Sequence, residues 1–463
     1  MKNLNWKGNF VGLLMAILFL WISVYIISRE YRSSANSMLY DASENLNSIL
    51  TQWYDLVIDL ETVTEGYRFP VVSRAYAYIG LAGYESVLPV FTGQFHSLTA
   101  NNQFTIPSID HPDDLHPGLV LNACYARITS HFFETVNTTM KTRIQELENR
   151  WEKKFSKDTE SQTINTSIEF GRAVAESIYS WSKKDSLGHQ SYLHNYDRNH
   201  QIIQSEGQWQ PASYNPMPPM LPYWGKVRPI VIDVDSFIAR PLPPYSSAAN
   251  SIYYQQAMEI YALHSPLSYE NRIIGLYWND DYRGLTFGHP SHWISIALQV
   301  LNKEKPYYTQ SLELMLKLGI SMFDASIACW NSKYIYNLER PEQFINNHIS
   351  AMWRPLEPSP SHPGYPSGHS SFGAAAAYTL TAFFGPEYKM VDNSHKRNEL
   401  FKFKPRKFNS FKEMSLENSL SRVLLGVHFR MDCEEGRRLG KSIARKVNSI
   451  SIHKLDTQLS YEN

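Results

Sequence analysis

The chain has 463 residues, enough for one large domain or two moderate ones. Its 44 basic and 44 acidic residues balance, which excludes the strong positive field of a polyanion-binding protein and argues against nucleic acid as a partner. The three cysteines, Cys124, Cys329 and Cys433, have neither metal-ligand nor redox spacing, so we expect them in the core of a fold that does not depend on disulfides.

The first predicted element is an apolar run near the N-terminus. It begins at Phe10, ends at Ile27, carries no charge and is just long enough to span a bilayer. A cleavable signal peptide is the alternative, although only a weak cleavage site follows at residues 33–35. We therefore predict that residues 1–34 are a membrane anchor or a signal sequence. The body of the protein would be exported, and either anchored outside the cytoplasm or secreted.

The rest of the chain shows helical patterns and no convincing strand of period two, which predicts an all-α fold of helical bundles. A proline-rich segment at residues 211–244 has no periodic apolar face and is interpreted as an ordered crossover loop, long enough to act as a lid. It separates a helical half at residues 35–245 from a second half at residues 246–463. Residues 389–412 are polar and basic, and we expect them on the surface. Helical patterns are clearest at residues 75–86, 138–157, 164–178, 293–301, 312–330, 370–384, 416–425 and 433–447.

The start of the predicted helix at residues 370–384 is the first candidate for a functional site. Prolines and glycines keep the preceding residues out of a regular helix, so Ser367, Gly368 and His369 lie where a loop enters a helix. Free backbone N–H groups and the positive end of the helix dipole favour a tetrahedral oxyanion there. Gly368 permits close approach of the backbone, Ser367 offers a hydroxyl group, and His369 can move a proton.

Two histidines at the start of the predicted helix at residues 293–301 leave two interpretations open. His289 and His292 flank Pro290 closely, which suggests a metal site, but no carboxylate is spaced as a third ligand. The alternative is a pair of buried histidines that support the structure or a neighbouring site.

Three separate segments together hold the cations and imidazoles that a buried oxyanion requires. A tetrahedral oxyanion carries one to three negative charges, so burying it takes several fixed cations and directional donors. Each segment alone is a weak signal, because a lone Lys, Arg or His usually faces solvent or packs in the core. The segments contain Lys333 and Arg340, then Ser367, Gly368 and His369, and finally Arg422, His428 and Asp432.

The spacing within these segments resembles a known superfamily. Lys333 is followed after six residues by Arg-Pro, the loop reads Pro-Ser-Gly-His, and the third segment reads Ser-Arg, three residues, Gly, one residue, His, three residues, Asp. This pattern is similar to that of the vanadium-dependent haloperoxidases and the type-2 phosphatidic-acid phosphatases, which include bacterial acid phosphatases. The resemblance implies a pair of helical bundles.

The resemblance also implies a role for each residue. A vanadate cofactor, or a phosphate, would be held by Lys333, Arg340, Ser367, Gly368 and Arg422, with His428 as the metal ligand or, in a phosphatase, the nucleophile. His369 would be the acid–base residue and, with Lys333, would activate hydrogen peroxide. Asp432, four residues beyond His428, would orient that imidazole. Vanadium would act as a Lewis acid without a change of oxidation state.

Peroxidase and phosphatase share one oxyanion site, so other features must separate them. The chain has a large N-terminal half, Trp330 matches a tryptophan near the active site of fungal chloroperoxidases, and His362 matches a second histidine in algal bromoperoxidases and bacterial iodoperoxidases. The plain alternatives are a core Trp330 and an ordinary loop residue at His362. We predict a haloperoxidase that oxidises halide, iodide or bromide favoured, with hydrogen peroxide.

Two other functions stay open at this point. One is a phosphomonoesterase that acts through a phosphohistidine, and the other is a catalytically silent, membrane-anchored protein that binds an oxyanion. The sequence does not give the organic acceptor or the oligomeric state.

Overall fold

The structure is a computed structural model that describes residues 43–91, 95–99, 104–212, 214, 216–280, 282, 284–397 and 403–452. The predicted anchor at residues 1–34 lies outside these ranges and stays a prediction. Among the helices that the structure describes, none is both long and apolar enough to cross a membrane.

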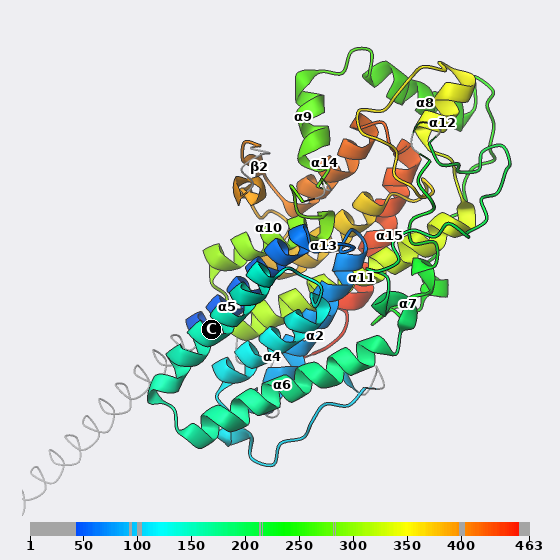
Figure 1. The fold of residues 1–463 in the computed structure, drawn as a ribbon. Helices are drawn as coiled ribbons and strands as arrows, with labels where there is room; N and C mark the ends of the chain where they lie inside the picture. The colour runs from blue at the N-terminus through cyan, green and yellow to red at the C-terminus, as the bar shows by residue number, and fades with distance from the viewer. Residues whose placement is uncertain are drawn as a thin grey trace, which may run out of the picture.

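The N-terminal part of the molecule is a group of antiparallel helices (Figure 1). Residues 43–63 are helical and pack with the four long helices that follow. These are α2 (Val71–Val87), α4 (Pro117–Phe132), α5 (Thr138–Phe155) and α6 (Ser161–Lys183), with the short α7 (Ser186–His189) after them.

The C-terminal part is also helical, as predicted. The long α11, α13 and α15 run through the middle of the molecule, and α8, α9 and α12 gather at one end (Figure 1). The helices are α8 (Ile252–Leu263), α9 (Tyr269–Tyr277), α10 (His289–Glu304), α11 (Tyr308–Tyr336), α12 (Pro341–His348), α13 (Gly368–Phe384), α14 (Phe411–Leu424) and α15 (Arg430–Asn448).

One small sheet departs from the purely helical expectation. Strands β1 (Met390–Asp392) and β2 (Arg406–Phe408) pair antiparallel within the segment predicted to lie on the surface. That prediction is wrong in part, because Asp392, His395 and Phe408 are buried. The sequence hides this burial, since the buried residues are scattered among lysines and arginines.

Helix α11 is the element on which both parts of the chain pack. It is buried along most of its length, and its apolar residues share one core with α2 and with α13 and α15. Cys124, Cys329 and Cys433 are free and buried, as predicted. The core therefore continues across the boundary predicted at residues 245 and 246, which stays a prediction.

The proline-rich crossover segment is ordered and fixed to α11. The buried carboxylate of Asp324 on α11 accepts backbone N–H bonds from Ile230, Val231 and Ile232 at 2.9–3.1 Å. A buried carboxylate with three such donors holds the loop without any periodic apolar face.

Close contact between α13 and α15 brings the segment that contains Arg422, His428 and Asp432 against the loop at Ser367. A Cβ atom at Gly440 would lie 1.9 Å from the carbonyl oxygen of Ser371, and one at Gly436 would lie 2.6 Å from that of Ser367. Because the nearest atoms belong to the backbone, they cannot move aside as a flexible side chain can. The two glycines therefore set the spacing of the helices that carry the candidate site.

We predict that Gly440→Ala destabilises the protein by roughly 1–3 kcal/mol, because the added methyl forces α13 and α15 apart. The exposed Lys446→Ala on the same helix is the control, and it should change the free energy of unfolding by less than about 0.5 kcal/mol. Denaturant unfolding of both variants checks this. If Gly440→Ala has the same free energy of unfolding as the wild type, α13 and α15 can separate without cost.

Candidate active site

A cavity of about 330 Å³ lies where the three motif segments meet. Its wall includes His362, Gly368, His369, Arg422 and His428, all of them predicted from the sequence. Segments that are separate in the chain thus line one cavity, and Arg340, which is not part of its wall, contacts both His362 and His428.

Three cations are buried around this cavity. Lys333, Arg340 and Arg422 are 0%, 2% and 3% exposed. The ammonium of Lys333 donates to the carbonyl oxygens of Pro363 and Gly364, both at 2.8 Å. Burial, assisted by the charge of Arg340, lowers the pKa of Lys333 to about 7. Burial likewise lowers the pKa of Arg340 to about 9 and that of Arg422 to about 10, so the protein alone does not balance their charges.

His428 is held in a defined tautomer between Arg340 and Asp432. Arginine can only donate, so the 3.1 Å contact from Arg340 Nη1 requires a lone pair on His428 Nε2. The proton therefore lies on Nδ1, which donates to Asp432 Oδ2 at 3.0 Å. Burial lowers the pKa of His428 well below its usual range, and Arg340 and Lys333 add to the effect. A neutral imidazole with an outward Nε2 lone pair is the form that bonds a metal.

Asp432 also connects this histidine to the loop at Ser367. Its carboxylate accepts from the backbone N–H of Phe429, and its carbonyl oxygen accepts from the N–H of Ser367 at 2.8 Å. Burial raises the pKa of Asp432, while Lys333 and Arg340 oppose the rise. One residue therefore fixes the position of both the imidazole and the helix entrance.

The N-terminus of α13 is arranged as the sequence predicts. The hydroxyl of Ser367 caps the helix and accepts from the N–H of Ser370. A Cβ atom at Gly368 would lie 2.7 Å from Phe69 and 3.3 Å from Trp330, so a larger residue does not fit there. The backbone at Gly368 therefore remains open to a ligand in the cavity.

His369 has its tautomer set by a main-chain carbonyl. Its Nε2 lies 3.4 Å from the carbonyl oxygen of Asn279, which can only accept, so Nε2 carries the proton and Nδ1 keeps a lone pair. Burial, with Arg422 and His289 nearby, lowers the pKa of His369 well below its usual range. The side chain of Asn279 also accepts from Arg422 Nη1 at 3.2 Å.

His362 and Trp330 lie together on the other side of the cations. The His362 ring lies 4.9 Å from Trp330, and its Nδ1 accepts from Arg340 Nη2 at 3.1 Å. His362 is 3% exposed and lines the cavity, as a residue with a role in the site would, and its role stays a prediction.

Sequence reasoning missed several residues that the structure brings to this site. Phe69 packs on Gly368, His369 and Trp330, and Asn279 contacts His369 and Arg422. Both come from loops far from the motifs, and no spacing or periodicity marks them.

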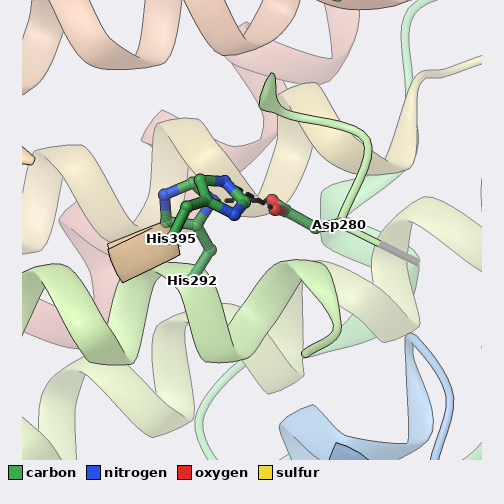
Figure 2. A group of neighbouring side chains, drawn as sticks. All are labelled: Asp280, His292 and His395. Atoms are coloured by element: carbon green, nitrogen blue, oxygen red, sulfur yellow. Dashed lines mark hydrogen bonds and ion pairs between the residues drawn. The ribbon is translucent and has the colours of Figure 1, made fainter. Parts of the chain in front are cut away.

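A second cluster of ionisable groups is buried behind His369, as Figure 2 shows for Asp280, His292 and His395. His292 Nδ1 lies 2.7 Å from Asp280 Oδ2, and its Nε2 lies 2.8 Å from Asp392 Oδ2. Burial by itself lowers the pKa of His292, but the two carboxylates outweigh it and raise the pKa to about 10. Burial raises and His292 lowers the pKa of Asp280, which ends at about 2, and that of Asp392 falls below its usual range for the same reasons.

The cation cluster fits an oxyanion. Asp432 contributes one negative charge against three buried positive charges, and Arg422 Nε is buried without a hydrogen bond among the described residues. The Nε2 lone pair of His428 and the close approach at Gly368 complete a set of donors and one ligand suited to vanadate or phosphate.

Comparison with known proteins agrees with this geometry. A family model for the VCPO second helical-bundle domain matches residues 313–455, which contain all three motif segments. The chain is also similar to the vanadium chloroperoxidase of Curvularia inaequalis, with 23% identity over 282 residues. That match covers 47% of this chain and 46% of the relative, less than half the length of either.

Solved structures extend the likeness over most of the chain. The crystal structure of the first bacterial vanadium-dependent iodoperoxidase superposes with a TM-score of 0.76 and 27% identity, covering 88% of this chain and 97% of that one. A holo-type bacterial vanadium-dependent chloroperoxidase gives a TM-score of 0.62 over 81% of this chain and 90% of that one. At 16% identity the second likeness concerns the fold alone.

Fold and site thus define a helical protein whose buried cations and imidazoles surround one cavity. Its residues 313–455 match the family model of the VCPO second helical-bundle domain, and its fold is similar to those of vanadium-dependent haloperoxidases.

We predict a pH-dependent loss of stability in His292→Gln. Between about pH 4 and about pH 6.5, His292, Asp280 and Asp392 carry the same charges in the unfolded chain as in the folded protein. Their ion triplet therefore contributes its full stabilisation in this range. Its contribution declines above about pH 6.5, toward the raised pKa of about 10, because only the folded state then holds the proton. It also declines below about pH 4, as the carboxylates take up protons.

The difference in Tm between wild type and His292→Gln should therefore be largest near about pH 5.5 and smaller near about pH 9.5. Lys446→Ala, at an exposed position on α15, is the control. A difference that stays constant with pH would contradict a charged His292.

Proposed function

We propose that this protein is a vanadate-dependent haloperoxidase that oxidises a halide with hydrogen peroxide to a hypohalous species. The observation that carries the proposal is the neutral His428, whose Nε2 lone pair lies within a group of three buried cations. Similarity to a vanadium chloroperoxidase and to a vanadium-dependent iodoperoxidase supports it.

In this proposal the protein's own residues bind and neutralise the cofactor. Lys333, Arg340 and Arg422 pair with the oxygens of vanadate, the backbone at Gly368 and the hydroxyl of Ser367 donate to it, and His428 is the metal ligand. Asp432 keeps the proton on His428 Nδ1, so that Nε2 keeps the lone pair that here accepts from Arg340 and that would bond the metal. Bound vanadate supplies a Lewis acid that activates hydrogen peroxide without a change of oxidation state.

His369 is the proton-transfer group of the site. Because the carbonyl of Asn279 holds the proton on Nε2, Nδ1 is free to accept a proton from peroxide and return it to the oxygen that leaves. Its lowered pKa keeps Nδ1 unprotonated at neutral pH, as a base requires. Lys333 adds positive charge where negative charge develops.

We predict that activity depends on vanadate and that phosphate competes for the same position, because the cations recognise a tetrahedral oxyanion. Protein stripped of vanadate should not oxidise iodide, should regain activity with orthovanadate, and should lose it in excess inorganic phosphate. Full activity after exhaustive removal would contradict the proposal. Hydrolysis of a phosphate monoester by the same sample, with no halide oxidation at any vanadate concentration, would favour the phosphatase instead.

We further predict that substitutions of His428 and of His369 have different effects. His428→Ala should lose vanadate, since it removes the metal ligand. His369→Ala should keep vanadate but lose turnover by roughly 10²–10⁴-fold, the usual contribution of general acid–base help. Elemental vanadium after desalting, measured beside steady-state rates, separates the two effects.

His131→Ala, on α4 and away from the cavity, is the matched control and should retain both properties. Loss of vanadium from the His369 variant with full retention in the His428 variant would reverse the assignment.

For the halide, we propose that iodide, and to a lesser extent bromide, is oxidised while chloride scarcely is. Chloride is the hardest of the three to oxidise and needs the driest site. His362 places a polar ring beside the cavity, with Nδ1 lying 3.1 Å from Arg340 Nη2 and 3.2 Å from the carbonyl oxygen of Pro363, so that its other nitrogen can interact with water or a large halide.

We predict that His362→Phe changes the ratio of iodide to chloride rates, because it replaces that polar ring with an apolar one. Rates with each halide at one peroxide concentration check this, with His348→Phe on α12 as the control. Efficient chloride oxidation by the wild type, or an unchanged ratio in His362→Phe, would show that His362 does not set the preference.

A further inference from the structure

The buried cluster behind His369 has no part in the chemistry described so far. It joins three segments: the turn at Asn279 and Asp280, the first turn of α10, and β1 with the residues after it. The cluster consists of Asp280, His289, His292, Asp392 and His395, which are all at most 2% exposed. Such groups are costly to bury, so their retention calls for a physical reason.

His292 is an imidazolium on geometric grounds. Both ring nitrogens face carboxylate oxygens at 2.7 and 2.8 Å, and a neutral ring could donate to only one of them. Asp392 is held in turn by the hydroxyl of Tyr277 at 2.7 Å and by the backbone N–H of Ser394 at 2.9 Å. Asp280 is therefore tied through His292 to a fixed point on β1.

The same arrangement argues against a metal ion at Asp280, His292 and His395, although their ligand atoms lie close together. A metal needs a ring lone pair, and both nitrogens of His292 are occupied by carboxylates. His395 Nε2 is also engaged, at 2.9 Å from the carbonyl oxygen of Tyr277.

Two connections lead from Asp280 to His369. The first is the main chain, because the carbonyl that receives His369 Nε2 belongs to the preceding residue, Asn279. Asp280 itself has a left-handed backbone with φ of 48°, which an Asp adopts when its side chain is fixed locally. The second is His289, whose Nδ1 lies 3.5 Å from Asp280 Oδ2, whose Nε2 lies 3.2 Å from the carbonyl oxygen of His369, and whose ring stacks on the His369 ring at 4.2 Å.

We propose that Asp280 is a positioning residue for His369, anchored by the His292 imidazolium and acting through the Asn279 carbonyl and the His289 ring. The role assigned to His369 rests on the proposed function. The anchored turn keeps the proton of His369 on Nε2 and its ring parallel to His289, so that Nδ1 is presented in one orientation.

Two other groups face His369 from the cavity side, Arg422 on α14 and His362 in the loop before α13. Neither makes a hydrogen bond to Asp280 among the described residues, although the charge of Asp280 acts on Arg422. Asp281, next in the chain, is outside the described residues. Replacing Asp280 keeps both side chains, so a change of orientation at His369 can be assigned to the turn and to His289.

The test is Asp280→Asn, an isosteric change that also tolerates the left-handed backbone. The amide keeps an acceptor oxygen but lacks the negative charge that pairs with the His292 imidazolium, so the turn should lose its anchor. With vanadate bound, kcat for iodide oxidation should fall by up to about 100-fold while KM for iodide is unchanged, since the loss is one of orientation.

A double-mutant cycle shows whether the effect passes through His369. In a His369→Ala background, Asp280→Asn should produce no further loss in kcat. Equal losses in both backgrounds would overturn the proposal. Asp392→Asn, at the far end of the triplet, should act in the same direction with a smaller loss, and it serves if Asp280→Asn fails to fold.

A second readout needs no halide oxidation. In vanadate-free protein with inorganic phosphate bound, the ¹⁵N resonances of the His369 ring should titrate at lower pH in Asp280→Asn. The reason is that loss of the Asn279 acceptor disfavours the protonated ring. Identical titrations in wild type and variant would overturn the proposal. A shifted titration in a protein that oxidises no halide would retain the positioning role while rejecting the proposed function.

Asp324→Asn is the matched control, because Asp324 is equally buried on α11 and supports backbone N–H groups away from the cavity. It should lower stability without moving the His369 titration. Elemental analysis closes the remaining alternative: a stoichiometric transition metal in wild type that disappears in Asp280→Asn would show that the cluster is a metal site.

Discussion

The burial of three cations around one cavity is the constraint on which the rest of this structure depends. Lys333, Arg340 and Arg422 are almost inaccessible to water, and the protein supplies little negative charge next to them. Unbalanced buried charge is expensive, so the folded state is built to receive an anion. Each element near the site serves this need: α11 and α14 carry cations, the loop before α13 supplies carbonyl acceptors, and the N-terminus of α13 adds donors.

The histidines of the site differ because their partners differ. A carboxylate takes the proton of His428 at Nδ1, whereas a carbonyl takes that of His369 at Nε2. The first therefore presents a lone pair as a ligand, and the second keeps its other nitrogen for proton transfer. His292 has a carboxylate on each side and stays charged. One kind of side chain thus has three chemical states within a single buried region.

The sequence predicts features that depend on residues close together in the chain, and it fails for contacts between distant segments. Helical periodicity anticipates α11, α13 and α15, and motif spacing brings Lys333, Arg340, Ser367 and His428 to one cavity, because both signals are local. Phe69, Asn279 and the pairing of His292 with Asp392 arise from contacts between distant segments, which leave no pattern in the chain. The prediction that residues 389–412 lie on the surface is wrong in part, because lysines and arginines surround the few residues that are buried there.

The most direct test of the account is the position of vanadium in a crystal of the protein grown with orthovanadate. An anomalous difference map should place the metal within bonding distance of His428 Nε2, in the cavity lined by His362, His369 and Arg422. A metal peak at Asp280, His292 and His395, or none at His428 in a crystal of active protein, would contradict it.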